Sequence, residues 1–277
     1  MALDLQNWIG RTESVEDVLD ARPAQLMQSI LPTGEPLSVG DRLPPLWCWL
    51  YFLKAVPLDE IGRDGHPRKG GFLPPVDLPR RMWAGGRFEF DGDLFIGDRI
   101  TRHSKILKVL PKEGKTGPLC FVTVEHSYVR AGETVCREEH DIVYREDPVP
   151  GAPKPAPVKP KVEFTNREGV DPSILTLFRY SALTFNGHRI HYDREYCRDV
   201  EGYHDLVFHG PLTATLLAGF AERESKGRLK TFSYRAVSPL FVDRKFNIYL
   251  NRGDGETQAI ACDPDCNLAM KAEATFE

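Results

Sequence analysis

The sequence predicts an α+β protein in which one unit, a short apolar helix followed by four antiparallel strands, occurs twice in a chain of 277 residues. Three observations predict this fold class. Each half contains an apolar segment that begins beside a proline, each such segment precedes four β-like stretches, and a proline-rich segment separates the halves. Apolar residues make up 41% and charged residues 27% of the chain, enough for a packed core, which excludes intrinsic disorder.

In the first half, residues 14–31 predict a leading helix that Pro23 interrupts. The very apolar residues 46–56, which follow Pro44 and Pro45, predict a short helix. A loop rich in glycine and proline comes next. Beyond it, four stretches predict strands: 81–90, 93–110, 118–130 and 133–146.

In the second half, apolar residues at a helical period predict a helix over residues 212–226. Pro211 suits its first turn, and Gly227 suits a left-handed residue at its end. Four strands are predicted to follow, at residues 230–237, 239–250, 256–263 and 266–276. Residues 94–98 of the first half parallel residues 240–243 of the second, which indicates a duplication.

The segment Pro148–Pro160 holds six prolines in thirteen residues and predicts an extended linker. It separates a first domain, residues 1–147, from a second, residues 161–277. A helix wrapped by a curved antiparallel sheet is the hot-dog arrangement, so two copies in one chain predict a double hot-dog.

Charge and hydropathy exclude several classes of function. The net charge is −4, which gives no electrostatic basis for binding nucleic acid or an acidic membrane surface. The longest apolar run, residues 43–56, is too short to span a bilayer. The acidic amino terminus shows neither a secretory nor a transit pattern, and six scattered cysteines do not suggest a disulfide framework. We therefore expect a cytoplasmic protein.

Two short segments carry the residues suited to catalysis. Four of the eight histidines lie between residues 188 and 209, and histidine is the natural proton carrier near neutral pH. His209 and Gly210 immediately precede the second predicted helix, whose first amides carry partial positive charge and can stabilise an oxyanion. This pair of features suits the addition or elimination of water beside a thioester carbonyl.

The segment Asn186-Gly-His188-Arg189-Ile-His191-Tyr-Asp193, followed by His209-Gly210, resembles the motif of MaoC-like (R)-specific hydratases. Residues 43–52 and 70–86 resemble one subgroup, which contains mitochondrial-type 3-hydroxyacyl-thioester dehydratases and bacterial mesaconyl-C4-CoA and itaconyl-CoA hydratases. The resemblance implies that His191 is the catalytic histidine and that the Gly210 amide binds the thioester oxygen. It also implies that the first half helps to hold the acyl-CoA tail.

The chain departs from the motif where the resemblance implies a catalytic aspartate, because Asn186 stands there. An asparagine amide does not transfer protons at neutral pH. We therefore expect His191 to perform the acid–base work and Asn186 to position water or substrate. His188 and Arg189 replace the Asn-Pro of the motif.

Four further residues are expected around the substrate, each with a structural alternative. Arg189 either meets a substrate carboxylate or is a surface charge, and Asp193 either follows the motif or caps a short helix. His188 occupies a variable position of the motif, and His209 is expected to support the helix start. A metal site built from His188, His191, His204, His209 and Asp193 is disfavoured, because Asn186-Gly187 indicates a turn.

The resemblance implies a hydro-lyase that needs neither a metal nor a redox cofactor, with coenzyme A present only as part of the substrate. We expect mesaconyl-C4-CoA or itaconyl-CoA as the substrate and citramalyl-CoA as the product, since Arg189 could pair with a free carboxylate. A homodimer is expected from the analogy of the fold.

Three alternatives stay open. The first is a 3-hydroxyacyl-ACP or 3-hydroxyacyl-CoA dehydratase of the fatty-acid type. The second is a non-catalytic hot-dog protein that binds acyl thioesters. The third is a thioester hydrolase, because activation of water beside an oxyanion site serves both reactions.

Overall fold

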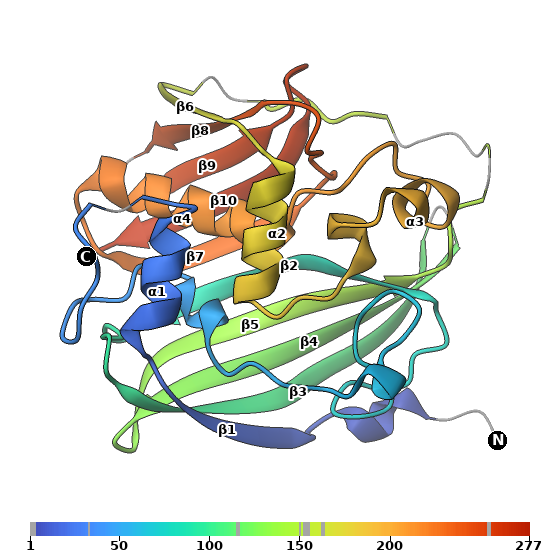
Figure 1. The fold of residues 1–277 in the computed structure, drawn as a ribbon, viewed down its shortest axis with the longest axis horizontal. Coiled ribbons are helices and arrows are strands. Elements are labelled where there is room, and N and C mark those ends of the chain that lie inside the picture. The colour runs from blue at the N-terminus through green and yellow to red at the C-terminus, as the bar shows by residue number, and fades with distance from the viewer. Residues whose placement is uncertain are drawn as a thin grey trace.

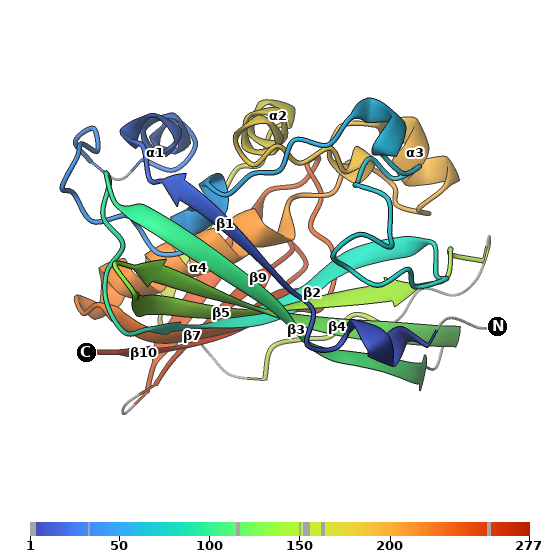
Figure 2. The ribbon, with the colours of Figure 1, turned by 90° about the horizontal axis from the view of Figure 1, so that it is seen from below.

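The computed structural model describes residues 4–32, 34–114, 117–149, 151, 156–161, 164–253 and 256–277. Its described strands form one ten-stranded sheet in the order β1-β3-β4-β5-β2-β7-β10-β9-β8-β6, and all neighbours are antiparallel (Figure 1). Helices α1, α2 and α3 lie on one side of the sheet (Figure 2), which we call its inner face. None of the described helices is long and apolar enough to cross a membrane.

The four strands predicted in the first half are confirmed, although the one predicted over residues 93–110 begins at Arg99. They are β2 (Arg80–Phe90), β3 (Arg99–Gly114), β4 (Gly117–Arg130) and β5 (Glu133–Arg145). Ala131 and Gly132 join β4 to β5, and both have positive φ, at 51° and 89°. That is the two-residue turn whose twist suits a β-hairpin.

The second half contains the predicted helix and four strands, but the strand predicted over residues 239–250 begins only at Phe246. Helix α4 (Gly210–Ser225) packs against the inner face and buries Leu212, Leu217 and Phe220. The strands are β7 (Leu229–Ala236), β8 (Phe246–Arg252), β9 (Thr257–Cys262) and β10 (Leu268–Phe276). Strand β6 (Asn166–Val170) and helix α2 (Ile174–Leu183) were not predicted. Helix α3 (Arg194–Asp199) is the short helix that Asp193 was expected to cap under the structural alternative.

The predicted stop of the second helix is wrong by one residue. Lys226, with φ 58°, is the left-handed residue, and its amide donates to the Glu222 carbonyl. Gly227 serves close packing instead, because a Cβ there would lie 3.1 Å from Cβ of Phe276 on β10.

The predicted leading helix over residues 14–31 is also wrong. Thr12–Val18 is strand β1, which pairs with β3 at the sheet edge, and only Ala21–Gln28 is helical, as α1. The exposed and less exposed residues of β1 alternate, as in a strand with one face toward the protein. Pro23 is the third residue of α1, where no intrahelical donor is lost.

The predicted helix over residues 46–56 is reduced to a 3₁₀ turn, η2 (Trp47–Leu50). Leu46 and Phe52 bracket this turn with φ of 68° and 59°, so the chain cannot continue as an α-helix on either side. Trp47, Cys48 and Leu50 of this turn are nevertheless buried, and Trp49 is half-buried. The following loop, residues 53–79 with the 3₁₀ turn η3 (Leu58–Glu60), lies over β3, β4 and β5 on the inner face (Figures 1 and 2).

The two halves repeat the same backbone hydrogen bonds at equivalent positions. The sequence parallel between residues 94–98 and 240–243 predicted this repeat. Leu43 N donates to Leu94 O and Phe208 N to Leu240 O, each at 2.8 Å. Isolated bridges Arg42–Phe95 and Val207–Phe241 flank these bonds. Pro44-Pro45 is therefore the structural equivalent of His209-Gly210.

Strands β2 and β7 join the halves into one sheet. Gly85 pairs with Arg235 and Gly86 with Tyr234. A Cβ at Gly85 would lie 2.5 Å from the Tyr234 carbonyl oxygen, so glycine permits the close approach. Of the predicted linker Pro148–Pro160, residues 150 and 152–155 lie outside the described part of the chain.

Candidate active site

His191 lies in the short 3₁₀ turn η4 (Arg189–His191) and is 6% exposed. Its Nδ1 is 2.7 Å from the carbonyl oxygen of Val207. A carbonyl only accepts, so Nδ1 carries the proton of the neutral ring and Nε2 presents a lone pair. Nε2 has no protein partner among the described residues and is not sealed from solvent. Burial lowers the pKa of His191 to about 4, so the ring is a neutral base at pH 7.

His209 holds His191 against the start of α4. The two imidazoles are stacked, with centroids 3.6 Å apart and planes inclined by 18°. His209 Nε2 is 2.9 Å from the hydroxyl of Ser181 on α2, and its ring contacts Tyr180 edge-on. Burial lowers the pKa of His209 well below its ordinary value. His209 is therefore a neutral, fully buried support for His191.

Gly210 is the first residue of α4, where an amide has no intrahelical acceptor. Pro211, the next residue, brings no donor that would compete for a ligand. A Cβ at Gly210 would meet no heavy atom within 4 Å, so the space beside its backbone is open. The positive end of a 16-residue helix thus adjoins the His191–His209 stack.

Asn186 shapes the turn that presents the histidines. Its Oδ1 accepts from the His188 amide at 3.0 Å, which is an Asx-turn, and Phe185 before it has φ 49°. A Cβ at Gly187 would lie 2.7 Å from the carbonyl oxygen of Gly65. A loop of the first half therefore rests directly on the motif of the second half.

That loop contributes His66, which the sequence reasoning missed. Its ring centroid lies 4.3 Å from that of His188, and the His188 ring lies 5.5 Å from His191. His66 Nδ1 is 2.9 Å from Oδ2 of Asp64. Burial lowers the pKa of both His66 and His188. The only sequence signal was a histidine beside an acid in a Gly/Pro loop, and nothing in its spacing connects it to residue 188.

The residues 46–242 match the family model of hydroxyacyl-thioester dehydratase type 2. The chain is 43% identical over 274 residues to the mesaconyl-C4-CoA hydratase of Chloroflexus aurantiacus, covering 97% of this chain and 96% of that protein. It belongs to the hydroxyacyl-thioester dehydratase type 2 family. The mitochondrial hydroxyacyl-thioester dehydratase type 2 of Schizosaccharomyces pombe is 26% identical, over 86% of this chain and 89% of that protein.

Solved structures show the same fold. A MaoC-like dehydratase from Phytophthora capsici matches with a TM-score of 0.75 and 15% identity, over 99% of this chain and 98% of that one. A Mycobacterium tuberculosis protein with a double hot-dog fold matches with a TM-score of 0.60 and 12% identity, over 97% and 96% of the two chains. The predicted double hot-dog fold is confirmed. The family model and the 43% identical hydratase confirm the resemblance to the predicted subgroup and the hydro-lyase class.

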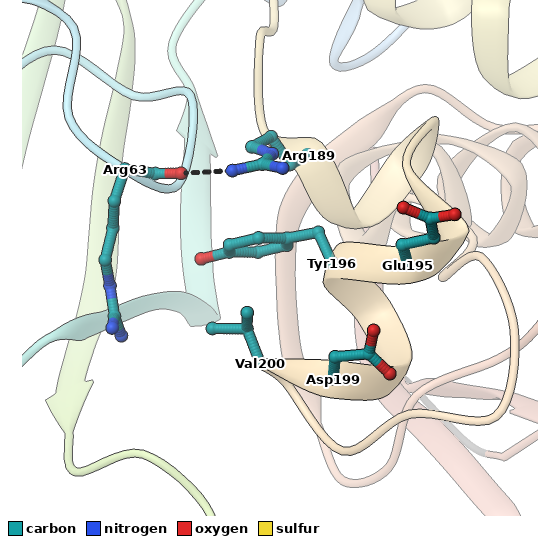
Figure 3. A pocket seen from close by; sticks show the side chains of 6 residues that line it. All are labelled: Arg63, Arg189, Glu195, Tyr196, Asp199 and Val200. Atoms are coloured by element: carbon teal, nitrogen blue, oxygen red, sulfur yellow. Dashed lines mark hydrogen bonds between the residues drawn. The ribbon is translucent and has the colours of Figure 1, made fainter.

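In this dehydratase-family chain, Arg189 and Asp193 pair with each other. Asp193 caps α3 by accepting from the Tyr196 amide at 2.9 Å, and its second oxygen accepts from Arg189 Nη2 at 2.7 Å. These contacts lower the pKa of Asp193. The Arg189 guanidinium also lies over the Tyr196 ring and donates to the Arg63 carbonyl oxygen (Figure 3). A substrate role for either side chain stays a prediction.

Arg189 lines a hollow of about 320 Å³ on α3. The hollow is formed by Arg63, Arg189, Glu195, Tyr196, Asp199 and Val200 (Figure 3). Neither His191 nor Gly210 belongs to its lining. The hollow therefore does not include the two groups that are predicted to act on the thioester.

Among the described residues, one set of side chains has a spacing that could hold a metal ion. The ligand atoms of Asp64, His66 and His188 all lie within 4.8 Å of one another. The Asp64 carboxylate is already hydrogen-bonded to His66, and burial lowers the pKa of both histidines, with the positive charge of Arg81 as a smaller cause. The same positive charge disfavours a cation here. A reaction without metal stays a prediction.

Proposed function

We propose that this chain is an acyl-CoA hydratase that adds water to mesaconyl-C4-CoA and forms citramalyl-CoA. The observation that carries the proposal is the neutral His191 ring, which presents Nε2 as a base beside the start of α4. The 43% identity to a mesaconyl-C4-CoA hydratase over nearly the whole chain supports this substrate class.

In the proposed reaction, His191 Nε2 takes a proton from water as the water oxygen attacks Cβ of the conjugated thioester. The electron pair of the double bond moves to the thioester oxygen, where the Gly210 amide and the helix start stabilise the enolate. The His191 imidazolium then returns a proton to Cα, so that one water molecule is added in total. General base catalysis contributes about 10²–10⁴-fold, and one oxyanion donor contributes about 10²–10³-fold.

The proposal is tested with mesaconyl-C4-CoA, itaconyl-CoA and crotonyl-CoA. We expect the absorbance of the conjugated thioester to fall with mesaconyl-C4-CoA, citramalyl-CoA to be identified by mass, and His191→Ala to abolish the change. An absence of hydration with every substrate would favour the non-catalytic alternative. Release of free thiol without hydration would indicate a thioester hydrolase.

A second candidate is a 3-hydroxyacyl-thioester dehydratase that acts on unbranched chains, on CoA or on acyl carrier protein. The family model and the Schizosaccharomyces pombe relative support it. The same residues would then work in the direction of water elimination. A higher kcat/KM for a medium-chain 3-hydroxyacyl thioester than for citramalyl-CoA would favour this candidate.

The proposal also covers the location, the oligomeric state and the cofactor requirement of the enzyme. We propose a cytoplasmic homodimer that has no resident cofactor and takes coenzyme A only with its substrate. Light scattering of the purified protein tests the dimer. Metal analysis of the active protein, with activity measured after treatment with a chelator, tests the reaction without metal.

A further inference from the structure

Asn186 stands where the resemblance implies a catalytic aspartate, but its amide oxygen is already in use. Its Oδ1 accepts from the His188 amide at 3.0 Å, so the side chain closes an Asx-turn. The attacking water has two hydrogens, and Nε2 of His191 accepts only one of them. A second acceptor beside His191 is therefore needed to hold the water in one orientation.

In the described part of the chain, two other imidazoles contact the His191 ring, but only one of them has nitrogens open to solvent. The stacked ring of His209 bonds to Ser181 through Nε2, and its Nδ1 is sealed from solvent. The His188 ring lies 5.5 Å from that of His191, with the two planes at 88°. Among the described residues neither nitrogen of His188 has a hydrogen-bond partner, and neither is sealed from solvent. His188 is therefore the neighbour of His191 that has free nitrogens.

The charge state of His188 suits it to accept a hydrogen bond. Burial lowers its pKa, so the ring is neutral at pH 7 and one of its nitrogens carries a lone pair. A water molecule bonded to two nitrogens spans up to about 6 Å between them. Because the centres of the His188 and His191 rings lie 5.5 Å apart, one water can bond to both rings.

A loop of the first half holds the His188 ring in place. The ring of His66 lies 4.3 Å from that of His188, with the planes inclined by 40°. His66 Nδ1 donates to the Asp64 carboxylate, which fixes the orientation of the His66 ring. The Asp64 carbonyl oxygen accepts from the amide of Arg189 at 2.9 Å, so the loop is also bonded to the residue after His188. His66 therefore supports the His188 ring from the other half of the chain.

We propose that His188 is a second catalytic residue, whose lone pair accepts from the water that His191 deprotonates, and that His66 is a positioning residue for the His188 ring. The proposal rests on the proposed hydratase function. As the water oxygen bonds to Cβ, Nε2 of His191 receives one proton. The hydrogen that is bonded to His188 stays on the oxygen and becomes that of the new hydroxyl group. His188 gains no proton, so the addition still consumes one water molecule.

The test replaces His188 with residues that differ in one property. His188→Phe keeps a ring against His66 but has no acceptor, whereas His188→Gln supplies an amide oxygen. The substrate is whichever of mesaconyl-C4-CoA, itaconyl-CoA and crotonyl-CoA the wild-type protein hydrates fastest. We expect His188→Phe to lower kcat by roughly 10–10²-fold, the loss of one hydrogen bond to a reacting group. KM and the inhibition constant of butyryl-CoA, which has no double bond to hydrate, should change by less than about threefold. His188→Gln should recover part of the lost kcat.

A double-variant cycle tests the role of His66. We expect His66→Ala to lower kcat by roughly tenfold in the wild-type background but by less than about twofold in the His188→Phe background, because His66 acts through His188. An equal loss in the two backgrounds would show that His66 does not position His188.

His204→Gln is the matched control, since the His204 ring packs on Phe241 and pairs with Asp243 instead of with these imidazoles. We expect its kcat to equal that of the wild-type protein. A wild-type kcat in His188→Phe would overturn the assignment, as would a loss in His188→Gln as large as that in His188→Phe. Thermal unfolding identifies a variant that does not fold, and His188→Leu then takes the place of His188→Phe. A wild-type protein inactive on all three thioesters would reject the proposed function as well, whereas an active one confines a failure to His188.

Discussion

At the scale of single residues, one carbonyl oxygen decides what His191 can do. Because Val207 O accepts from Nδ1, the lone pair lies on Nε2, and burial lowers the ring's pKa to about 4. Protonation would remove the base, so we expect kcat to stay level near neutral pH and to fall as the pH approaches 4. A pH–rate profile on mesaconyl-C4-CoA checks this, and a midpoint near 6.5 would contradict the inferred environment.

The same shift predicts how stability changes with acid. The unfolded chain binds a proton at His191 near pH 6.5, whereas the folded chain binds it only near pH 4. The unfolded state therefore binds more protons in this window, and the folded state loses stability as pH falls through it. We expect His191→Gln to lessen the loss of unfolding free energy between pH 7 and 5, measured by urea denaturation. An unchanged pH dependence in this variant would contradict the assignment.

Substitution of His191 should lower kcat more than substitution of Asn186. Asn186 has its amide oxygen in a turn, while His191 holds the proton-accepting atom. We expect His191→Ala to lower kcat by about 10³-fold, within the range of general base catalysis, and Asn186→Ala to lower it by roughly tenfold. Steady-state kinetics of both purified variants measure this. Equal residual rates would refute the division of roles.

Gly210→Ala separates a ligand contact from a folding effect. The added Cβ meets no protein atom within 4 Å, and this glycine does not have a positive φ. We expect the free energy of unfolding to change by less than about 1 kcal/mol and kcat/KM to fall by roughly tenfold, because the methyl group would meet the thioester. A marked loss of stability in denaturant titrations would show that the space is not open.

At the scale of elements, the pairing of β2 with β7 requires glycine at position 85, because the two backbones approach closely there. A Cβ at Gly85 would lie 2.5 Å from the Tyr234 carbonyl oxygen, so the strands must separate to admit it. We expect Gly85→Ala to destabilise the protein by about 2–4 kcal/mol. Gly71→Ala, where a Cβ meets nothing within 4 Å, is the control in the same urea titration. Equal stability of the two variants would contradict the close approach.

The sequence predicted elements wherever local pattern and tertiary packing agree. Most strands of both halves agree with alternation, helix α4 agrees with helical period, and the turn at Asn186-Gly187 agrees with Asn-Gly chemistry. Residues 12–18 form a strand because they pair with the edge of β3. This long-range pairing cannot be predicted from the local sequence pattern. His66 was missed for the same reason, since only the folded loop brings its ring to that of His188.

At the scale of the whole molecule, a buried ion pair links the first half to the second. Arg80 of the first half bonds to Glu201 of the second, with both side chains about 95% buried. Arg80→Met would leave the Glu201 carboxylate buried without its cation, which costs about 3–5 kcal/mol. We expect the double variant Arg80→Met with Glu201→Gln to recover part of this loss. Thermal unfolding of the three proteins measures it, and additive losses would contradict the pairing.

The structural equivalence of Pro44-Pro45 with His209-Gly210 predicts how many ligand molecules one chain binds. Both halves share one backbone arrangement. In the earlier copy, the first half, the two prolines supply neither an imidazole nor an amide hydrogen. A tight-binding enolate mimic should therefore saturate one equivalent per polypeptide. We expect no second equivalent to bind at the earlier copy, and a stoichiometry of two would contradict this.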